Sequence, residues 1–546
     1  AAAAAVSGLR TIVTMKHVGL NVAADPLMTL AYVGVKGGMV IINADDPSLF
    51  SSQNEQDNRY FARLSGLPML EPTTSQEMKD MTLAAFEMSE ALELPVIIRT
   101  TTRLAHVRGA VELGELKPVT KKATFEKNPF RFVTVPAVSR NLHKVLLGKF
   151  DQASEISNGD AYNEVIGTGK WGIVANGACF NYVKDAVLDL GIGDSVSILK
   201  LVMSWPQPET LCIDFMKKMD KVLVVEELEP INETELKAMA QENGITIPIK
   251  GKGVGAFSRL FEYDPGMVRQ TIADYFGIEY KAPEQLDISA TPVLPARPPN
   301  LCAGCPHRAT YYAVKQVFGK DAIFPTDIGC YTLGVLPPIS MADFVICMGS
   351  SVSSSCGFAQ ATDQKVVSFI GDSTFFHSGM TGLANAVHNN HKFTLVILDN
   401  GTTAMTGHQI HPGVNTEAMG IERTRISIEN VVRGLGVQDV HMIKPFKLKK
   451  AMESIKKAME YDGLSVIISE ELCPLFAKAT KQFKKTKPFR VNHDKCKNHR
   501  DCINLLACPA MYLEGDRVEI DKIACIGCTV CAQVCPENAI VPVKEG

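Results

Sequence analysis

Cysteine spacing near the carboxyl end limits what this chain can fold into more than any other feature. Residues 525–536 read Cys-Ile-Gly-Cys-Thr-Val-Cys-Ala-Gln-Val-Cys-Pro, which is the pattern C-x2-C-x2-C-x3-C-P. In this pattern three thiolates bind one Fe4S4 cube, and the fourth crosses to a second cluster. The spacing therefore predicts a ferredoxin-like α+β domain over residues 485–546 that holds two [4Fe-4S] clusters.

A second group of cysteines supplies the other half of this domain. It reads Cys496-Lys-Asn-His499-Arg-Asp-Cys502 and is followed by Cys508-Pro509. By the crossing rule, one cluster takes Cys508, Cys525, Cys528 and Cys531. The other takes Cys496, Cys502 and Cys535, and His499 stands where a fourth cysteine is expected. Three interpretations of His499 stay open: it ligates the fourth iron, it lies beside a [3Fe-4S] cluster, or it is a surface histidine at a poorly occupied site.

The composition excludes several classes of protein. At 546 residues the chain is too long for one hydrophobic core, so three or four domains are expected. A net charge of −3 gives no reason to expect nucleic acid or a membrane surface as a partner, and no apolar run reaches the ~18–20 residues of a membrane span. The start shows no secretory signal pattern. The run Ala1–Ala5 resembles a helix entered midway, so we expect the mature amino terminus to lie upstream.

The distribution of the fifteen cysteines indicates metal chemistry rather than disulfides. An odd total, with tight clustering after Cys496, is typical of metal binding in a reducing compartment. We therefore expect a cytoplasmic protein that is sensitive to oxygen. Four cysteines lie in apolar or small-residue runs and are expected in the core, namely Cys179, Cys212, Cys347 and Cys356.

Short apolar strands alternate with helices through most of the chain. Residues 1–112 contain expected strands at 11–15, 38–42 and 94–98 and a helix over 75–92, and residues 166–285 contain expected strands at 171–175, 196–201 and 221–225. Continuous apolar runs of this length are typical of parallel sheets buried on both faces. Residues 113–165 are polar and are expected to connect these two units. The proline-rich stretch 281–300 is expected to be a linker.

A third α/β unit is expected over residues 286–480, with strands at 366–370 and 393–398. At its end, six positive charges between Lys478 and Arg490 stand without an acidic residue. This segment is interpreted as a solvated linker, and a landing surface for an acidic electron carrier is the alternative.

Two strand ends of the third unit carry groups suited to magnesium and diphosphate. The Asp372 carboxylate, the Asn400 amide oxygen and the Thr402 carbonyl are hard oxygen ligands of the kind that Mg2+ prefers. Both strand ends fall at the carboxyl edge of a parallel sheet, where such ligands bind. This pattern is typical of thiamine diphosphate enzymes; two ordinary strand-to-helix turns are the alternative. Three residues at the first strand end are expected to meet the diphosphate: Gly371, which allows close approach, and the helix-start amides of Ser373 and Thr374.

Two adjacent and two distant cysteines surround this third unit. Cys302 and Cys305 open it in C-x2-C spacing, Cys330 follows, and Cys473 closes it. Together they can hold a third cluster once the sheet has folded. From spacing alone, a structural turn with buried free thiols is an equal alternative.

At this point the motifs resemble one family over essentially the whole chain. They are similar to the large (alpha) subunit of indolepyruvate ferredoxin oxidoreductase, within the 2-oxoacid:ferredoxin oxidoreductases. The residues that carry the resemblance are Thr14–Asp25, Ser51–Asp57, Arg99–Arg103, Leu301–Arg308, Asp327–Gly334, Gly371–Gly379 and Thr402–Gln409.

The resemblance implies a fold, a reaction and partners. The implied order of domains is a pyrimidine-binding domain, a transketolase C-terminal-like domain, a diphosphate-binding domain and the ferredoxin domain. The implied reaction is oxidative decarboxylation of an aryl 2-oxoacid to an acyl-coenzyme A, with thiamine diphosphate and Mg2+ as cofactors and electrons leaving singly through the clusters. A beta subunit and ferredoxin are the implied partners in a hetero-oligomer. The family also implies a proximal [4Fe-4S] cluster on Cys302, Cys305, Cys330 and Cys473, and cofactor binding at Gly329 and Gly349.

Two departures from the family pattern matter. His499 replaces a usual cysteine, and the glutamate that protonates the aminopyrimidine in these enzymes would lie just before Ala1. For the substrate pocket, His17, Gln53 and Asn54 are polar candidates on loops after expected strands, with turn and cap residues as the alternative. Two other functions remain as alternatives: a non-oxidative thiamine diphosphate decarboxylase or carboligase, and an electron-transfer subunit whose chemistry lies on a partner chain.

Overall fold

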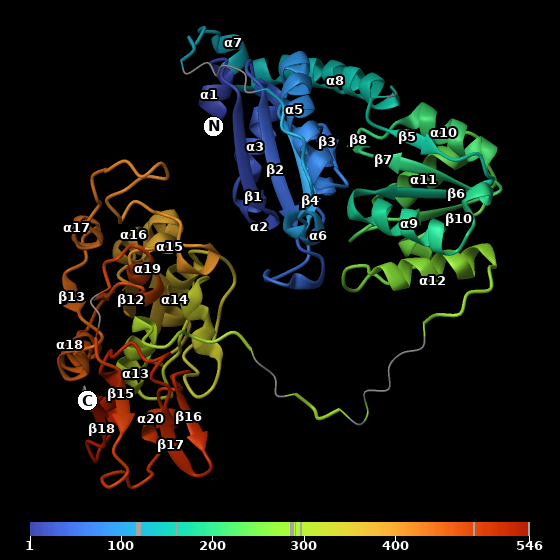
Figure 1. The fold of residues 1–546 in the computed structure, drawn as a ribbon. Coiled ribbons are helices and arrows are strands. Elements are labelled where there is room, and N and C mark those ends of the chain that lie inside the picture. Colours follow the sequence, from blue (N-terminus) through green and yellow to red (C-terminus); the bar gives the residue numbers. More distant parts are fainter. Residues whose placement is uncertain are drawn as a thin grey trace. The chain divides into compact units, whose positions relative to one another are not determined.

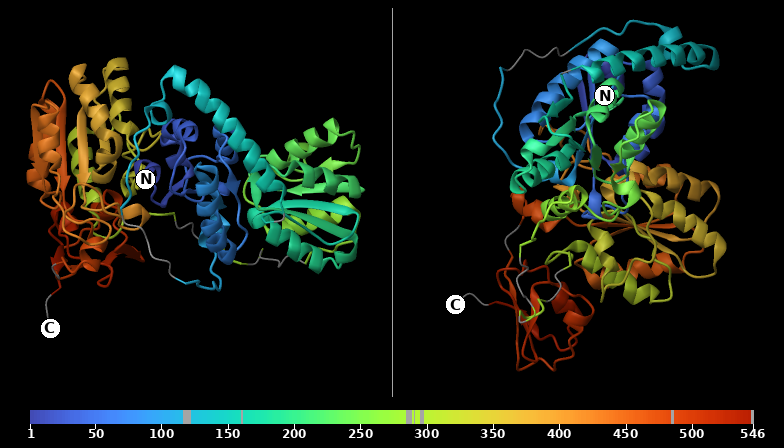
Figure 2. Two further views of the ribbon diagram at one scale, coloured as in Figure 1. Left: turned by 90° about the horizontal axis from the view of Figure 1, so that it is seen from above. Right: turned by 90° about the vertical axis from the view of Figure 1, so that its right-hand side faces the viewer.

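The computed structural model describes residues 1–115, 122–159, 161–283, 289, 291–294, 298–483 and 486–543 (Figures 1 and 2). The chain divides into two compact units, residues 1–290 and 291–546. Parts of the expected linker 281–300, and Lys484 and Lys485 of the basic segment, lie outside the described residues. None of the described helices combines the length and apolar character needed to cross a membrane.

The first sheet of unit 1 has the order β1-β2-β4-β3-β8 and is parallel except for the β3–β8 pair. Every residue of β4 is buried, as the apolar run in its sequence predicts. Helix α5 has the expected bounds because the Thr74 side chain caps it, accepting a hydrogen bond from the Glu77 amide. The strands are β1 (Thr11–Lys16), β2 (Met39–Asp45), β3 (Met69–Leu70), β4 (Val96–Thr101) and β8 (Met203–Trp205), and the helices are α1 (Ala2–Val6), α2 (His17–Val22), α3 (Ala24–Val33), α4 (Arg59–Ser65), α5 (Ser75–Leu92) and α6 (Thr102–His106).

The second sheet of unit 1 has the order β10-β9-β6-β7-β5, with only β5 antiparallel to its neighbour. Its three central strands lie at the positions that the sequence predicts. The strands are β5 (Glu164–Ile166), β6 (Trp171–Asn176), β7 (Val196–Leu201), β9 (Lys221–Val225) and β10 (Ile249–Lys250), and the helices are α9 (Gly177–Asp189), α10 (Glu209–Lys218), α11 (Ile231–Glu242) and α12 (Pro265–Phe276).

The polar segment between the two sheets contains more structure than its composition indicates. It forms α7 (Pro129–Phe132) and the long helix α8 (Pro136–Asn158). One side of α8 is buried, with Leu146 and Ala153 in the core of the first sheet. The helix touches α3 and α5 beside that sheet and α10 beside the second (Figures 1 and 2). The segment reads as polar because the rest of the helix surface faces solvent.

Unit 2 begins with a four-stranded parallel sheet of order β11-β12-β14-β13. The two expected strands appear one residue later than predicted. The strands are β11 (Val367–Gly371), β12 (Thr394–Asp399), β13 (Asp439–Ile443) and β14 (Ser465–Glu470), and the helices are α13 (Pro306–Phe318), α14 (Ser350–Ala361), α15 (Asp372–Thr374), α16 (Met380–His388), α17 (Ile428–Gly434), α18 (Leu448–Glu460) and α19 (Pro474–Ala479).

The carboxyl-terminal domain of unit 2 is small and built from two antiparallel pairs, β15–β18 and β16–β17. Its strand β15 takes the last residues of the basic segment. The elements are β15 (Phe489–Val491), α20 (Asp501–Asn504), β16 (Met511–Glu514), β17 (Arg517–Ile520), α21 (Val530–Val534) and β18 (Ile540–Pro542). This is the α+β ferredoxin-like arrangement that the cysteine spacing predicts.

The prediction that four cysteines lie in the core is wrong for one of them. Cys179, Cys212 and Cys356 are buried, but Cys347 is exposed. The apolar run that precedes Cys347 is itself partly exposed, with Ile346 at 60% of its full accessible area. Apolar neighbours in sequence therefore did not imply burial here.

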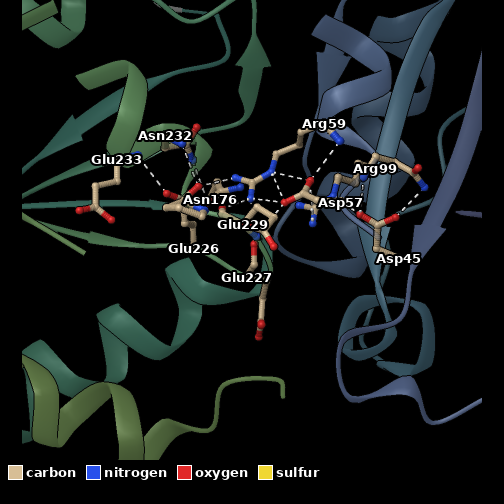
Figure 3. Close-up of polar contacts among 12 residues, drawn as sticks. Asp45, Asp57, Arg59, Arg99, Asn176, Glu226, Glu227, Glu229, Asn232 and Glu233 are labelled. Atoms are coloured by element: carbon tan, nitrogen blue, oxygen red, sulfur yellow. Dashed lines mark hydrogen bonds and ion pairs between the residues drawn. The ribbon is translucent and has the colours of Figure 1, made fainter. Parts of the chain in front are cut away.

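Buried charges join the two sheets of unit 1 (Figure 3). The Arg59 guanidinium at the start of α4 lies 2.6 Å from Asp57 and 2.5 Å from Glu226, which follows β9. Arg99 on β4 lies 2.5 Å from both Asp45 and Glu71. All six side chains are less than 9% exposed. Burial raises the pKa of Asp45 to about 6 and raises the pKa of Glu226, so these acids depend on the arginines to stay ionised.

We expect Arg59→Met to destabilise unit 1 by about 3–5 kcal/mol, because it leaves Glu226 buried without its cation and Asp57 with only the more distant Arg99. The matched control is Arg259→Met, which removes an exposed pair with Glu229 and should leave unfolding nearly unchanged. Hydrogen exchange of peptides from β2, β4 and β9 in increasing urea measures both. Equal exchange in the two variants would contradict a supporting role for the buried pairs.

Candidate active site and cluster-binding groups

The expected magnesium ligands meet at the carboxyl edge of the unit 2 sheet. Strands β11 and β12 pair in parallel with Gly371 opposite Leu398, so the residues after each strand are neighbours. Asp372 and Asn400 are 2% and 7% exposed, and Thr402 is 2% exposed. The Thr402 hydroxyl is buried without a hydrogen-bond partner among the described residues. Asp372 and Asn400 thus bring hard oxygen donors of neighbouring loops to one edge of the sheet, the kind of donor that a small divalent cation prefers.

Main-chain amides hold the Asp372 carboxylate in place. Its Oδ2 accepts hydrogen bonds from the amides of Asn400 (3.1 Å) and Gly401 (2.8 Å). Its Oδ1 accepts from the Ser373 amide at 2.8 Å, so the amide expected to meet a diphosphate is bonded to this carboxylate. His411 Nε2 lies 3.2 Å from Oδ2. His411 Nδ1 accepts from the Gly413 amide at 3.1 Å, so Nε2 is the ring nitrogen that faces Asp372.

A buried histidine orients the Asn400 amide. Asn400 Oδ1 accepts a hydrogen bond from the Thr402 amide at 3.0 Å, and its Nδ2 lies 3.2 Å from His307 Nε2. Burial lowers the pKa of His307 to about 4, so its ring is neutral and Nε2 can accept from the amide. The amide oxygen keeps a second lone pair, which is the group expected to ligate magnesium.

The Asp327 carboxylate holds Gly349 and the backbone just before Gly329. The Asp327 carboxylate is fully buried and accepts hydrogen bonds from the amides of Ile328 (2.9 Å), Gly349 (2.6 Å) and Ser351 (2.9 Å). Gly349 has φ +92° and precedes α14, and a Cβ there would lie 1.8 Å from Ser378 Oγ. This position therefore requires glycine.

Tyr331 fills the space beside Gly371 and Thr374. Its hydroxyl lies 3.3 Å from Thr374 Oγ1, and a Cβ on Gly371 would meet its ring at 2.7 Å. The helix that begins at Asp372 passes through a π-helical turn at Phe375–Gly379 before α16. Such turns occur often at functional sites.

The four thiols around this sheet lie near one another. Cys302 and Cys305 form the loop before α13, Cys330 opens a 3₁₀ turn, and Cys473 precedes α19. The Cys473 charge contributes to raised pKa values at Cys302 and Cys330, after burial in each case. No three His, Cys, Asp or Glu side chains in the described part of the chain converge on a single ion. Cluster-binding thiolates need wider spacing, because a cube of iron and sulfur separates them.

Each expected cluster of the carboxyl-terminal domain has a small cavity. One is lined by Cys508, Cys525, Cys528 and Cys531 together with Gly304 and Ile526. The other is lined by Cys496, Cys502 and Cys535 together with His499, Asp501 and Glu537. The thiols thus group as the crossing rule predicts, and their cofactors stay a prediction.

His499 is half-exposed and bonded to an acid. Its Nε2 lies 3.0 Å from Glu537 Oε1, while Lys497 lies 3.2 Å from the other oxygen of that carboxylate. The hydrogen bond with His499, followed by the one with Lys497, lowers the pKa of Glu537. With Nε2 occupied, Nδ1 is the ring nitrogen left for other contacts.

The three candidates for substrate chemistry lie at the carboxyl edge of the first sheet in unit 1. His17 follows β1 and is fully buried, and neither ring nitrogen has a hydrogen-bond partner among the described residues. Burial, then the Lys16 charge, lowers its pKa. Gln53 and Asn54 are exposed on the loop after β2, and Asn54 Oδ1 accepts from Gln56 at 2.9 Å. Their catalytic roles stay a prediction.

The same edge borders a cavity of about 800 Å³, which no sequence pattern predicted. Arg103, which follows β4, lies in its wall, and Glu262 holds the guanidinium through Nε at 2.9 Å and through Nη2. Apolar and aromatic groups line the rest, including Phe50, Leu104, Val107 and Tyr182. The sequence motifs also did not single out His307 and His411 as site residues. Both stand within or just beyond the quoted motifs, but only the fold shows which side chains they face.

Comparisons with known proteins identify the domains and the family of this chain. Residues 1–148 match the family model "Pyruvate flavodoxin/ferredoxin oxidoreductase, thiamine diP-bdg", residues 327–469 match "Thiamine pyrophosphate enzyme, C-terminal TPP binding domain", and residues 518–541 match "4Fe-4S binding domain". The indolepyruvate oxidoreductase subunit IorA of Methanothermobacter marburgensis is 47% identical over 99% of this chain and 88% of its own length. This chain belongs to the IorA family of 2-oxoacid:ferredoxin oxidoreductases.

Other members are similar to a comparable degree. IorA of Thermococcus kodakarensis is 42% identical over the whole chain and 88% of its own length. A solved 2-oxoglutarate:ferredoxin oxidoreductase from Magnetococcus marinus, at 22% identity and a TM-score of 0.30, covers 33% of this chain and 66% of its own. Family membership thus rests on sequence, and it confirms the parallel-sheet thiamine diphosphate domains and the iron–sulfur domain that the sequence predicts.

We expect Asp372→Asn to weaken magnesium-dependent binding of thiamine diphosphate by more than about tenfold, because the amide replaces the anionic ligand. Iron content should not change, since Asp372 binds no cluster. The control is Asp462→Asn, an exposed aspartate paired with Lys392. Titration calorimetry with and without Mg2+ measures the affinity, and undiminished binding in the Asp372 variant would refute the magnesium assignment.

Proposed function

We propose that this chain catalyses the oxidative decarboxylation of aryl 2-oxoacids, such as indolepyruvate, to acyl-coenzyme A, and that its clusters pass the electrons to ferredoxin. One observation carries the proposal. The Cys473 amide donates a hydrogen bond to the Asn400 carbonyl at 3.0 Å, so a magnesium ligand and a cluster thiol share one hydrogen-bonded junction. His307, which bonds Asn400, is two residues from Cys305. An oxidation beside the diphosphate would thus have an electron acceptor at its edge.

The residues of unit 2 have defined tasks in this function. Asp372, Asn400 and the Thr402 carbonyl would hold Mg2+, and Gly371 and Thr374 would border the diphosphate. His307 and His411 keep the ligands oriented, and Asp327 shapes the glycine turns at Gly329 and Gly349. Bound thiamine diphosphate would supply the stabilised carbanion on which decarboxylation depends. Clusters suit the oxidation because each accepts one electron at a time.

The unit 1 cavity has the chemistry of an aryl 2-oxoacid site. Glu262 occupies Nε and Nη2 of Arg103, which leaves the Nη1 donors to meet a substrate carboxylate through charge-assisted hydrogen bonds. Phe50, Leu104, Val107 and Tyr182 offer apolar and aromatic surface for an aryl ring. At about 800 Å³ the cavity is within the usual range for small-molecule sites.

We expect an anaerobic substrate panel to show the highest kcat/KM for indolepyruvate, a lower value for phenylpyruvate and the lowest for pyruvate. The reason is that burial of an aryl ring against the apolar wall of the cavity strengthens binding. The assay follows ferredoxin reduction with thiamine diphosphate, Mg2+ and coenzyme A, and analyses the organic product. Aldehyde without reduced ferredoxin would favour a non-oxidative decarboxylase. Failure of the chain to bind thiamine diphosphate would favour an electron-transfer subunit.

The proposed electron path contains three iron–sulfur clusters. A proximal [4Fe-4S] cluster takes Cys302, Cys305, Cys330 and Cys473, and a second takes Cys508, Cys525, Cys528 and Cys531. The third takes Cys496, Cys502 and Cys535, with His499 as the fourth ligand through Nδ1. Glu537 supports this choice because its carboxylate engages Nε2, and ligating histidines usually donate their other nitrogen to such a partner.

We expect His499→Ala to show the electron paramagnetic resonance signal of an oxidised three-iron cluster, because the fourth iron loses its ligand. His499→Cys should restore four irons at a lower potential, since an anionic thiolate replaces a neutral imidazole. Asp501→Asn is the control, as Asp501 lines the same cavity. A three-iron signal in the Asp501 variant alone would transfer the ligand role to that carboxylate.

The remaining parts of the function concern partners and compartment. The beta subunit of the same oxidoreductase would complete a hetero-oligomer, and ferredoxin would accept electrons from the carboxyl-terminal domain. The abundance of free thiols supports a reducing, cytoplasmic setting.

A further inference from the structure

Two C-x2-C loops from distant parts of unit 2 pack directly on each other. Gly304, between Cys302 and Cys305, lies against Ile526, between Cys525 and Cys528. Gly304 has φ +67°, and a Cβ there would lie 2.1 Å from Ile526 Cδ1. Ala303 and Gly304 line the same cavity as the four thiols of the second cluster. The absence of a side chain at residue 304 thus lets the two cluster loops meet.

The buried side chain of Arg308 joins the two loops through hydrogen bonds. It lies one turn into α13 and is 4% exposed. Its Nη1 donates to the Ala507 carbonyl at 2.7 Å and to the Leu506 carbonyl. Its Nη2 donates to the Leu301 carbonyl and lies 3.3 Å from Asn300 Oδ1. One guanidinium therefore joins the backbone just before Cys302 to the backbone just before Cys508.

The positive charge of Arg308 interacts with thiols of both expected cluster groups. No carboxylate pairs with it in the part of the chain that the structure describes; its hydrogen-bond acceptors are carbonyls and an amide. Its electrostatic contacts are instead with Cys508, Cys305, Cys302 and Cys528, which come from both cluster groups. A buried cation interacts strongly with nearby charge because the surrounding dielectric constant is low. Such a cation favours the reduced cluster, which is one unit more negative than the oxidised form.

We propose that Arg308 is a positioning residue that holds the two cluster loops together and raises the reduction potential of the cluster bound by Cys508, Cys525, Cys528 and Cys531. This inference rests on the proposed cluster assignment. Because the charge also faces Cys302 and Cys305, it would raise the potential of the proximal cluster as well, and the shift of the second cluster is the one that the experiment follows.

Redox titration of the holoenzyme, followed by electron paramagnetic resonance, tests the proposal. Arg308→Met should lower the ratio of reduced to oxidised second cluster about tenfold at a fixed potential, which is ~59 mV for a one-electron centre. Arg308→Lys keeps the charge without the planar fork, so its midpoint should stay near that of the parent. In both variants the magnetic splitting between the two reduced clusters should change, because the fork no longer sets their spacing. Arg433→Met, which removes an exposed arginine bonded to Glu429 on α17, should change neither signal.

Iron content and the parent spectrum separate this inference from the proposed function. A parent protein that holds no cluster at Cys508 would contradict the cofactor assignment itself. With clusters present, an unchanged midpoint in Arg308→Met at full iron content would overturn the role of the charge. Equal midpoint shifts in the Lys and Met variants would also overturn it, since the lysine retains the charge.

Discussion

Parallel strand pairing is the constraint on which the chemistry of this protein depends. Neighbouring parallel strands end at the same edge of a sheet, so residues far apart in sequence become neighbours there. In unit 2 this places Asp372 and Asn400 together, with Cys473 bonded to the same loop. In unit 1 the same rule gathers His17 after β1 and Arg103 after β4. This protein thus has carboxylate, amide, thiol and imidazole groups at sheet edges, with apolar strands beneath them.

Buried arginines connect the parts that the strands alone do not. Arg59 joins the two sheets of unit 1 through Glu226, and Arg99 links segments of the first sheet through Asp45 and Glu71. Arg308 joins two cluster loops of unit 2 through main-chain carbonyls. A planar guanidinium presents several donors in a fixed geometry, which suits such junctions better than lysine. The two cases differ in charge balance: the unit 1 arginines face carboxylates, whereas Arg308 faces thiols that would carry clusters.

Much of the fold could be predicted because its signals are local. Apolar runs located the central strands, α5 has the bounds expected for residues 75–92, and the spacing of Cys525–Cys535 indicated the iron–sulfur domain. Other features depended on contacts that no local pattern records. The sequence predicted a polar connection where helix α8 lies, because only one side of this helix is buried. It also predicted a core position for Cys347, although Cys347 and the residues just before it are exposed. Sequence periodicity reports what a segment could bury, and the neighbours decide what it does bury.

The candidate site divides in the same way. The sequence by itself determined the kinds of ligand: thiols at cluster spacing, a carboxylate and an amide after strands, and glycines where the backbone must approach closely. Only the tertiary structure decided which of them meet. It set His307 against Asn400, His411 against Asp372, and Gly304 against Ile526. The physical reason is that ligand type is a property of single residues, whereas hydrogen bonds and close packing join residues that lie far apart along the chain.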